Sequence, residues 1–225
     1  MKISICSIEG LADAASYDAA SLKIDAMRRE KLARIKGETE RKRSLCAGLL
    51  VNYAVWQFQK EQECDFGQVE EVSPAELLCI PRQEYDYRQD SNGKPYLADL
   101  PGFFFNVSHS GDYVLLARDT KELGADIQKM DRTVTDALAG KVLSKAEYAH
   151  YCTLPNEEQR KAFYRAWTIK ESCCKLTGKG LSQDFREMKL SETGQEIVLI
   201  GEARRIHFQA LPWKEEYWLA VSRFV

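Results

Sequence analysis

The sequence has no long apolar run: nothing in its 225 residues approaches the ~18 to 20 apolar residues that span a bilayer. Its start, MKISICSIEG, has no apolar stretch long enough for a signal peptide, and we expect none. The formal net charge is only -2, which gives no indication of nucleic-acid binding through bulk charge. We therefore expect a soluble, cytoplasmic protein that binds neither membrane nor nucleic acid.

Paired cysteine motifs are also missing. The seven cysteines are odd in number, form no CxxC pair and are accompanied by no His-x₃-His motif. Zinc sites and disulfide frameworks need such pairing, so this pattern argues against both. We interpret the cysteines as small, reduced hydrophobic residues.

The residues that are present predict an α+β chain. Hydrophobic residues make up 44% of the sequence, enough for one large or two small domains. Helical spacing predicts helices at about 21–36, 39–61, 133–151 and 157–176, with Ser144 capping a second segment of the third. Alternation predicts strands at 1–8, 103–107, 113–117, 123–127 and through the C-terminal third. We expect two α+β halves of antiparallel strands and packed helices, 1–102 and 103–225, joined near Pro101-Gly102.

A basic segment lies in the first half. Residues 28–43 hold eight Lys or Arg and three Glu, and Arg41 and Arg43 fall in the first turns of a predicted helix. The positive end of the helix dipole disfavours cations there. A bound anion would offset this, and so would carboxylates elsewhere; a solvated helix face is the alternative reading of the whole segment.

Two side chains of a predicted strand could form a metal site, and one helix face carries further charged groups. Asp126 and Gln128 are two residues apart on a predicted strand, so both point to one side and could hold a hard cation such as magnesium. Trp167, Glu171 and Lys175 share one face of the longest predicted helix. The alternatives are an Asp in a strand-end turn and a surface salt-bridge ladder, although Trp167 suggests a partly buried face.

Two predicted turns carry further polar groups. Asn92-Gly93 favours a tight turn that places Lys94 and Pro95 just past its apex. The segment 108–112, Ser-His-Ser-Gly-Asp, predicts a hairpin turn whose hydroxyls, imidazole and backbone N–H groups suit an anion. A serine nucleophile with a neighbouring histidine base is conceivable there, as is a simple capped turn.

The order of these segments carries a family resemblance. NGKPYL, FNVSHSGDYV, GADIQ and FYRAWTIKESCCKLTGKGL resemble, in this order, the signature segments of Sfp-type 4′-phosphopantetheinyl transferases. The basic helices of the first half extend the resemblance over most of the chain. It implies a monomeric pseudo-dimer of two similar α+β halves with coenzyme A between them.

The resemblance also implies a reaction and roles for residues. A magnesium ion would be held by Asp126, Glu171 and Gln128, where Gln128 stands at a position that is usually Glu. Lys175 would lie near the pyrophosphate as a catalytic residue, and Glu171 would activate the acceptor serine. The 4′-phosphopantetheine group would pass from coenzyme A to a serine of an apo acyl or peptidyl carrier protein in fatty-acid, polyketide or nonribosomal peptide synthesis.

Coenzyme A contacts are implied in the first half and at its end. Arg28, Lys31 and Arg43 match the basic cluster of the family, and guanidinium groups suit phosphate. The positions matched around the adenosine and its 3′-phosphate are Lys94, Pro95, Ser108 and His109. Two other functions stay open: a magnesium-dependent phosphodiesterase using the same acids, and a non-catalytic coenzyme A or nucleotide binding module, to which only Gln128 points.

Overall fold

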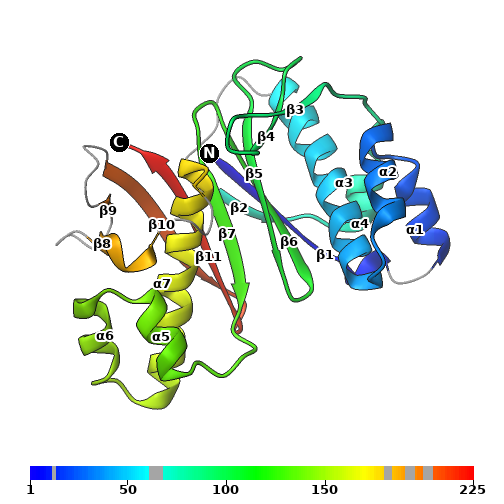
Figure 1. Cartoon of the computed structure of the whole chain (residues 1–225). Coiled ribbons are helices and arrows are strands. Elements are labelled where there is room, and N and C mark those ends of the chain that lie inside the picture. The colour runs from blue at the N-terminus through cyan, green and yellow to red at the C-terminus, as the bar shows by residue number, and fades with distance from the viewer. Residues whose placement is uncertain (12–13, 61–67, 180–183, 191–195, 200–204) are drawn as a thin grey trace. The chain divides into compact units, whose positions relative to one another are not determined.

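The computed structural model describes residues 1–11, 14–60, 68–179, 184–190, 196–199 and 205–225. They form two compact units, Met1–Lys121 and Glu122–Val225 (Figure 1). The boundary that the sequence suggested, between 102 and 103, lies inside the first unit. The reason is that the hairpin after residue 103 pairs with the N-terminal strand of the chain and completes the sheet of that unit.

The first unit is a four-stranded sheet with helices. Its described elements are β1 (Lys2–Ser7), η1 (Glu9–Leu11), α1 (Ala14–Ser21), α2 (Ala26–Arg34), α3 (Glu38–Lys60), β2 (Gln68–Glu71), α4 (Pro74–Leu78), β3 (Tyr87–Gln89), β4 (Pro95–Leu97), β5 (Phe104–Ser110) and β6 (Tyr113–Asp119). The sheet order is β2-β1-β6-β5, with β1 parallel to β2 and antiparallel to β6. The long helix α3 packs on β1 and β6 around one apolar core.

The cations at the start of α3 have partners in its first turn. The Lys42 ammonium lies 2.6 Å from a Glu38 carboxylate oxygen, and the Arg43 guanidinium is paired with Glu40. Arg43 Nε and Nη2 also donate to the Gly111 carbonyl at 3.0 and 2.6 Å. Carboxylates of the same turn therefore offset the unfavourable dipole position of these cations.

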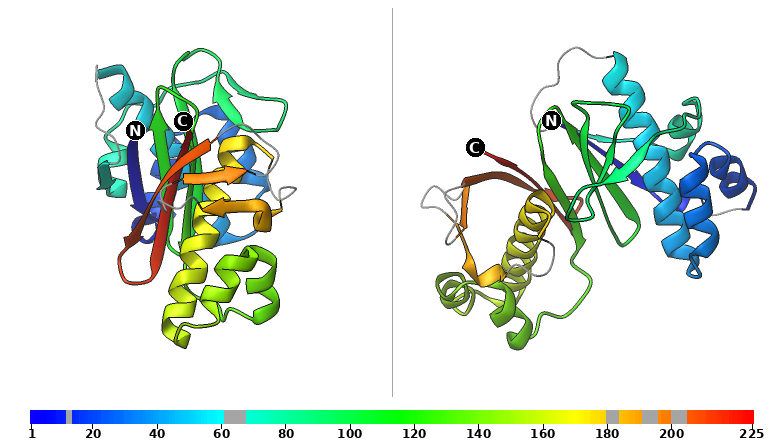
Figure 2. Two further views of the ribbon diagram at one scale, coloured as in Figure 1. Left: turned by 90° about the vertical axis from the view of Figure 1, so that its left-hand side faces the viewer. Right: turned by 45° about the horizontal axis from the view of Figure 1, so that its top comes forward.

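The second unit is a five-stranded antiparallel sheet covered by α7. Its described elements are β7 (Gly124–Lys129), α5 (Asp136–Val142), α6 (Lys145–Tyr151), α7 (Asn156–Thr177), η3 (Phe185–Glu187), β8 (Met188–Leu190), β9 (Glu196–Leu199), β10 (Arg205–Trp213) and β11 (Tyr217–Phe224). The strand order is β7-β11-β10-β9-β8. Helix α7, yellow in Figures 1 and 2, packs along β7, β11 and β10.

The two units share a layout. In each, the first strand pairs antiparallel with the last, and the last two strands form a hairpin. The longest helix follows the first strand in sequence and packs on the first and last strands. The α+β fold of two similar halves is thus confirmed. They differ at the sheet edges: β2 extends the sheet beyond β1, whereas β9 and β8 extend it beyond β10.

The helix ends in the second unit agree with the sequence predictions. Ser144 caps α6 in a reciprocal capping box with Glu147, and Thr135 caps α5. Helix α7 ends at Gly178, whose φ of 72° is the left-handed conformation that glycine adopts at low cost. No helix of the described residues is both long and apolar enough to cross a bilayer.

One of the two predicted turns is confirmed and the other is wrong in extent. The β3–β4 turn has Gly93 at φ 81°, and the Asp90 carboxylate accepts from the backbone N–H of Asn92 and Lys94. By contrast, Ser108 and Ser110 belong to strand β5, because the β5–β6 ladder continues to the pair Ser110–Tyr113. Only residues 111–112 form the turn, with Gly111 at φ 54°.

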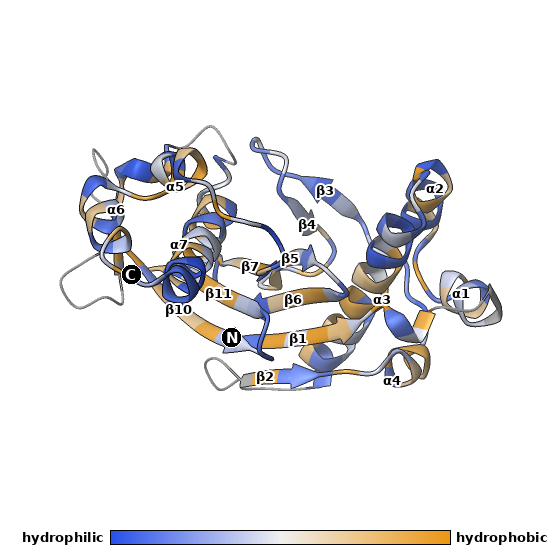
Figure 3. Ribbon diagram, turned by 90° about the horizontal axis from the view of Figure 1, so that it is seen from below, coloured by the Kyte–Doolittle hydropathy of each residue, from blue (hydrophilic) through white to orange (hydrophobic). Residues whose placement is uncertain are grey.

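Hydropathy follows the packing. In Figure 3 the strands β1 and β6 are coloured as mainly hydrophobic, whereas helix α2 is coloured as mainly hydrophilic. Leu32 is the single buried residue of α2, whereas about half of the residues of α3 are buried. The N-terminus of α2 is capped by the Asp25 carboxylate, which accepts from the Arg28 N–H at 2.9 Å.

Helix α7 and strand β7 touch at Gly124. A Cβ added to Gly124 would lie 1.9 Å from the Ser172 carbonyl oxygen and 2.6 Å from the Leu176 nitrogen, both in the backbone of α7. Real Cβ atoms do not approach backbone atoms so closely, so only glycine permits this contact. The position of α7 over the sheet therefore depends on a single missing side chain.

We predict that Gly124→Ala lowers the free energy of unfolding by ~1–3 kcal/mol, the usual cost of overpacking a core. The matched control is Gly140→Ala in α5, where an added Cβ meets no atom within 4 Å. Removing a helical glycine should stabilise that variant by ~0.5–1 kcal/mol. Urea unfolding followed by far-ultraviolet circular dichroism checks both, and equal midpoints for the two variants would contradict the packing described.

Candidate functional site

A buried carboxylate anchors the candidate site of the second unit. Asp126 of β7 is 1% exposed, and its Oδ1 lies 2.7 Å from the Nζ of Lys175 on α7. Gln128 Nε2 donates to Asp126 Oδ2 at 3.0 Å, so both side chains project from the same side of the strand, as the alternation predicted. The close approach at Gly124, two residues earlier, is what places β7 and α7 within reach of these bonds.

Glu171 belongs to the same electrostatic group. Burial raises the pKa of its carboxyl, the negative charge of Asp126 raises it further, and the Lys175 ammonium partly opposes the rise. Asp126 is thus close enough to repel Glu171. The positive charge of Lys175 interacts with both carboxylates. The structure brings together Asp126, Gln128, Glu171 and Lys175.

The face of α7 that carries these residues is partly buried. Trp167 contacts Phe163 and Phe185, with ring centroids 5.8 and 5.7 Å apart. Lys175 pairs with Asp126 of the neighbouring strand. A salt-bridge ladder confined to the helix surface does not describe this geometry.

The donor atoms of the group suit a hard cation. The described residues hold no cluster of three His, Cys, Asp or Glu side chains. A cation here would be held by the carboxylates of Asp126 and Glu171 and the amide oxygen of Gln128, a set made only of oxygen atoms. Magnesium and calcium prefer oxygen ligands, whereas zinc and copper prefer nitrogen and sulfur. The residues present therefore fit magnesium.

The first unit contains a basic pocket of about 580 Å³. It is lined by residues of the α2 start and the β3–β4 hairpin: Asp25, Met27, Arg28, Lys31, Tyr87, Arg88, Gln89, Gly93 and Pro95. Three of the residues expected to contact coenzyme A, Arg28, Lys31 and Pro95, therefore meet in one cavity. Lys94 lies beside Pro95 in the chain, after the hairpin turn.

Arg28 is held in a defined place within this pocket. Its guanidinium carbon lies 5.4 Å from the centre of the Tyr87 ring, within the range of a cation–π interaction. Its stem crosses α3 at Gly48, where an added Cβ would come within 2.4 Å of Arg28 Cδ. The side chain is thus oriented by packing from both sides.

The remaining expected residues lie at the β5–β6 end of the first unit. Arg43 binds the Gly111 carbonyl of that turn. Ser108 is buried and His109 is exposed, as expected for successive residues of a strand, whose side chains point to opposite faces. A nucleophilic pair of Ser108 with His109 is therefore contradicted by the geometry.

Sequence reasoning missed several residues. Tyr87 and Arg88 line the basic pocket, but they fall in a stretch read only as polar and turn-rich. Lys170 is 1% exposed in the core face of α7, where the buried Phe163, Ala166 and Cys173 recur at helical spacing. A lysine within an apolar stripe was the signal that could have found it.

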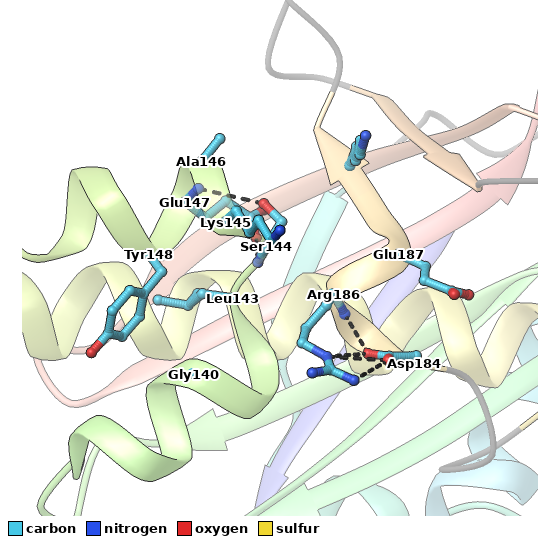
Figure 4. A pocket seen from close by; sticks show the side chains of 11 residues that line it. Gly140, Leu143, Ser144, Lys145, Ala146, Glu147, Tyr148, Asp184, Arg186 and Glu187 are labelled. Carbon is cyan, nitrogen blue, oxygen red and sulfur yellow. Dashed lines mark hydrogen bonds and ion pairs between the residues drawn. The ribbon is translucent and has the colours of Figure 1, made fainter.

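A larger pocket, of about 890 Å³, contains none of the expected site residues (Figure 4). It lies in the second unit between the start of α6 and the segment of Asp184, Arg186 and Glu187. Its volume alone assigns it no role.

Family models match both units of the chain. The model described as "4'-phosphopantetheinyl transferase, N-terminal" matches residues 70–121, and "4'-phosphopantetheinyl transferase superfamily" matches residues 122–222. A 4′-phosphopantetheinyl transferase of Bacillus subtilis is 30% identical over 224 residues, covering 98% of this chain and 91% of the relative. The chain belongs to the Sfp-type 4′-phosphopantetheinyl transferase family.

Two further proteins to which this chain is similar are named 4′-phosphopantetheinyl transferases. Sfp of Bacillus subtilis strain 168 is 32% identical, with 80% of this chain and 72% of that protein covered. The transferase psf-1 of Bacillus pumilus is 37% identical, but the match spans 56% of this chain and only about half, 55%, of psf-1. A solved holo-(acyl-carrier-protein) synthase of Bacillus anthracis is 19% identical with a TM-score of 0.40, covering 46% of this chain and 94% of that one.

We predict that Glu171→Gln stabilises the protein in EDTA at neutral pH. The pKa of Glu171 is raised above its usual 4.5, so the folded state disfavours the charged form and loses stability as the pH rises above that value. The advantage of the variant over the wild type should therefore shrink as the pH falls toward 4.5 and disappear below that value. Urea midpoints at several pH values check this.

The control for that prediction is Glu158→Gln, on an exposed part of the same helix. It should leave the midpoint unchanged. If Glu171→Gln were no more stable than the wild type at neutral pH, the electrostatic description of the site would be wrong.

Proposed function

We propose that this chain transfers 4′-phosphopantetheine from coenzyme A to a serine of an apo acyl or peptidyl carrier protein and releases 3′,5′-ADP, with magnesium as cofactor. The observation that supports it most is the meeting of Asp126, Gln128, Glu171 and Lys175 in a chain of this family. Phosphoryl transfer needs negative charge neutralised and a nucleophile positioned, and these are the groups that can do both.

Asp126, Gln128 and Glu171 would hold the magnesium ion. When bound, the ion would neutralise charge on the pyrophosphate of coenzyme A. Burial and the negative charge of Asp126 raise the pKa of Glu171, and a bound cation would offset both. Gln128 offers an oxygen without a charge, so this set carries one negative charge less than a set with Glu at that position.

Lys175 and Glu171 would handle the leaving and attacking groups. The Lys175 ammonium, held 2.7 Å from Asp126, would neutralise the departing 3′,5′-ADP and could donate a proton to it. Glu171, the other carboxylate of the group, would take the proton of the carrier serine. A tight metal ligand is a poor base, so this dual role is tested by Glu171→Gln, which should lose most of its turnover.

The basic pocket of the first unit would bind the 3′-phosphate of coenzyme A. Arg28 and Lys31 supply positive charge, and the half-buried ring of Tyr87 orients the guanidinium. An oriented guanidinium forms stronger bonds to phosphate than a freely rotating one, because less conformational entropy is lost on binding.

The reaction is tested by incubating a purified apo carrier protein with this protein, coenzyme A and magnesium, and measuring the intact mass of the carrier by mass spectrometry. We expect a gain of about 340 Da, the mass of the group that such a transfer moves. EDTA and Glu171→Ala should abolish the gain. Coenzyme A cleavage without a carrier would instead indicate a phosphodiesterase, and coenzyme A binding without any gain across several carriers would indicate a binding module.

The pocket is tested by Arg28→Met. Loss of one charged phosphate contact should raise the KM for coenzyme A by about 10- to 100-fold. The KM for dephospho-coenzyme A, which lacks the 3′-phosphate, should not change.

The control for the pocket is Arg34→Met, a residue of the same helix with an exposed side chain paired only at 3.8 Å with Glu30 among the ion pairs described. It should leave both KM values unchanged. An equal rise for both substrates in Arg28→Met would contradict recognition of the 3′-phosphate.

A further inference from the structure

Lys170 is a charged residue in the core of the second unit. Its side chain is 1% exposed, among the largest fully buried side chains of the described residues. Its ammonium group donates to the Val142 carbonyl at 2.8 Å and to Glu147 Oε2 at 2.6 Å. Lys170 of α7 is thus bonded to the last residue of α5 and to the first turn of α6.

Glu147 uses the same oxygen for a second purpose. Its Oε2 also accepts from the backbone N–H of Ser144 at 2.7 Å, which is half of the capping box of α6 (Figure 4). One carboxylate oxygen therefore joins the N-terminal cap of α6 to the ammonium group of α7. We call Lys170, Glu147 and the Val142 carbonyl the lysine bridge.

Stability alone is a poor reason for such a bridge. Removing two charges from water costs about as much as their attraction returns, and apolar residues of similar size often replace buried ion pairs without loss. The neighbouring core positions of α7 are indeed apolar, including Phe163, Ala166 and Cys173. What an ion pair adds over apolar packing is direction, because its bonds are satisfied in only one geometry.

The lysine bridge bonds to the turn of α7 that carries Glu171. Lys170 precedes Glu171 in the chain, and Ser172 follows it. The Ser172 carbonyl lies against Gly124 of β7, so this turn is held by the strand through Ser172 and by α5 and α6 through Lys170. Rotation of α7 about its axis would break one of these contacts, and the same rotation would move Glu171 away from Asp126.

We propose that Lys170 is a positioning residue: through Glu147 and the Val142 carbonyl it fixes the rotation of α7 and thereby the direction of the Glu171 carboxylate. Lys170 acts through the helix, since its ammonium group is bonded to Glu147 and to the Val142 carbonyl within the core. This inference rests on the proposed function, in which Glu171 is a metal ligand and base.

The test compares two variants that differ only in the bridge. Glu147→Gln keeps an acceptor for both Ser144 and Lys170, since glutamine also serves in capping boxes. Adding Lys170→Met removes the ammonium group and leaves neither charge buried. In the carrier assay with coenzyme A and magnesium, we expect Glu147→Gln to keep a kcat within about threefold of the wild type, because hydrogen bonds of the same geometry remain.

The double variant should behave differently. Its kcat should fall by about 100-fold, the effect of misplacing a reacting group by about 1 Å. Its KM for coenzyme A should not change, and circular dichroism and thermal unfolding should show a folded protein at the assay temperature. A role in stability alone would lower the melting temperature and leave the kcat of the folded enzyme unchanged.

A further variant and a control complete the design. Glu147→Ala, at a partly exposed position, removes the carboxylate partner of Lys170. The unpaired ammonium should lower the melting temperature, and the kcat of the protein that is folded at the assay temperature should fall at constant KM. Glu158→Gln breaks the exposed pair with Lys161 on the same helix and should change nothing. A wild-type kcat in the double variant or in Glu147→Ala would overturn the inference. A wild type that modifies no carrier would overturn the proposed function instead.

Discussion

The contact between the backbone of α7 and Gly124 is the constraint on which the second unit depends. It brings a helix and a strand closer than any side chain would allow, and the two acids and the lysine of the site lie within two turns of it. The sheet supplies Asp126 and Gln128, and the helix supplies Glu171 and Lys175. Neither element supplies all four side chains, so the site forms only because the helix and the strand lie this close together.

That closeness has an electrostatic cost. The carboxylates of Asp126 and Glu171 lie together in a buried site with the Lys175 ammonium. Burial and the charge of Asp126 raise the pKa of Glu171 there. Charged sites of this kind are unfavourable in the folded state until a cation arrives. The residues proposed to do chemistry are therefore among those that contribute least to folding, which is a common relation between activity and stability.

Much of this could be predicted from the sequence, and the reasons for the rest are physical. The Ser144 cap, the end of α7 and the Asn92-Gly93 turn follow from local preferences and were predicted. The helix predicted at 21–36 was wrong at its start, because α1 ends at Ser21 and α2 begins after the Asp25 cap. The same alternation that defines strands placed Asp126 and Gln128 on one side. The extent of β5 was missed because Ser108 and Ser110 are residue types typical of turns, although both pair with β6 of the same hairpin, Ser108 with Leu115 and Ser110 with Tyr113. The basic pocket and the lysine bridge depend on which segments meet, and local patterns do not carry that information.

The shared layout of the two units also has a consequence for synthesis on the ribosome. In each unit the first strand pairs with the last one made: β1 with β6, and β7 with β11. Contacts between such distant segments make folding slow, because a long loop must close before they form. The strand β1 pairs with β2 on one edge, but its other edge stays unpaired until Asp119 has been translated, so a nascent chain that ends near residue 102 holds helices around an unfinished sheet. Such edges favour pairing with other chains, and the interval before β6 appears is when this protein is most exposed to aggregation.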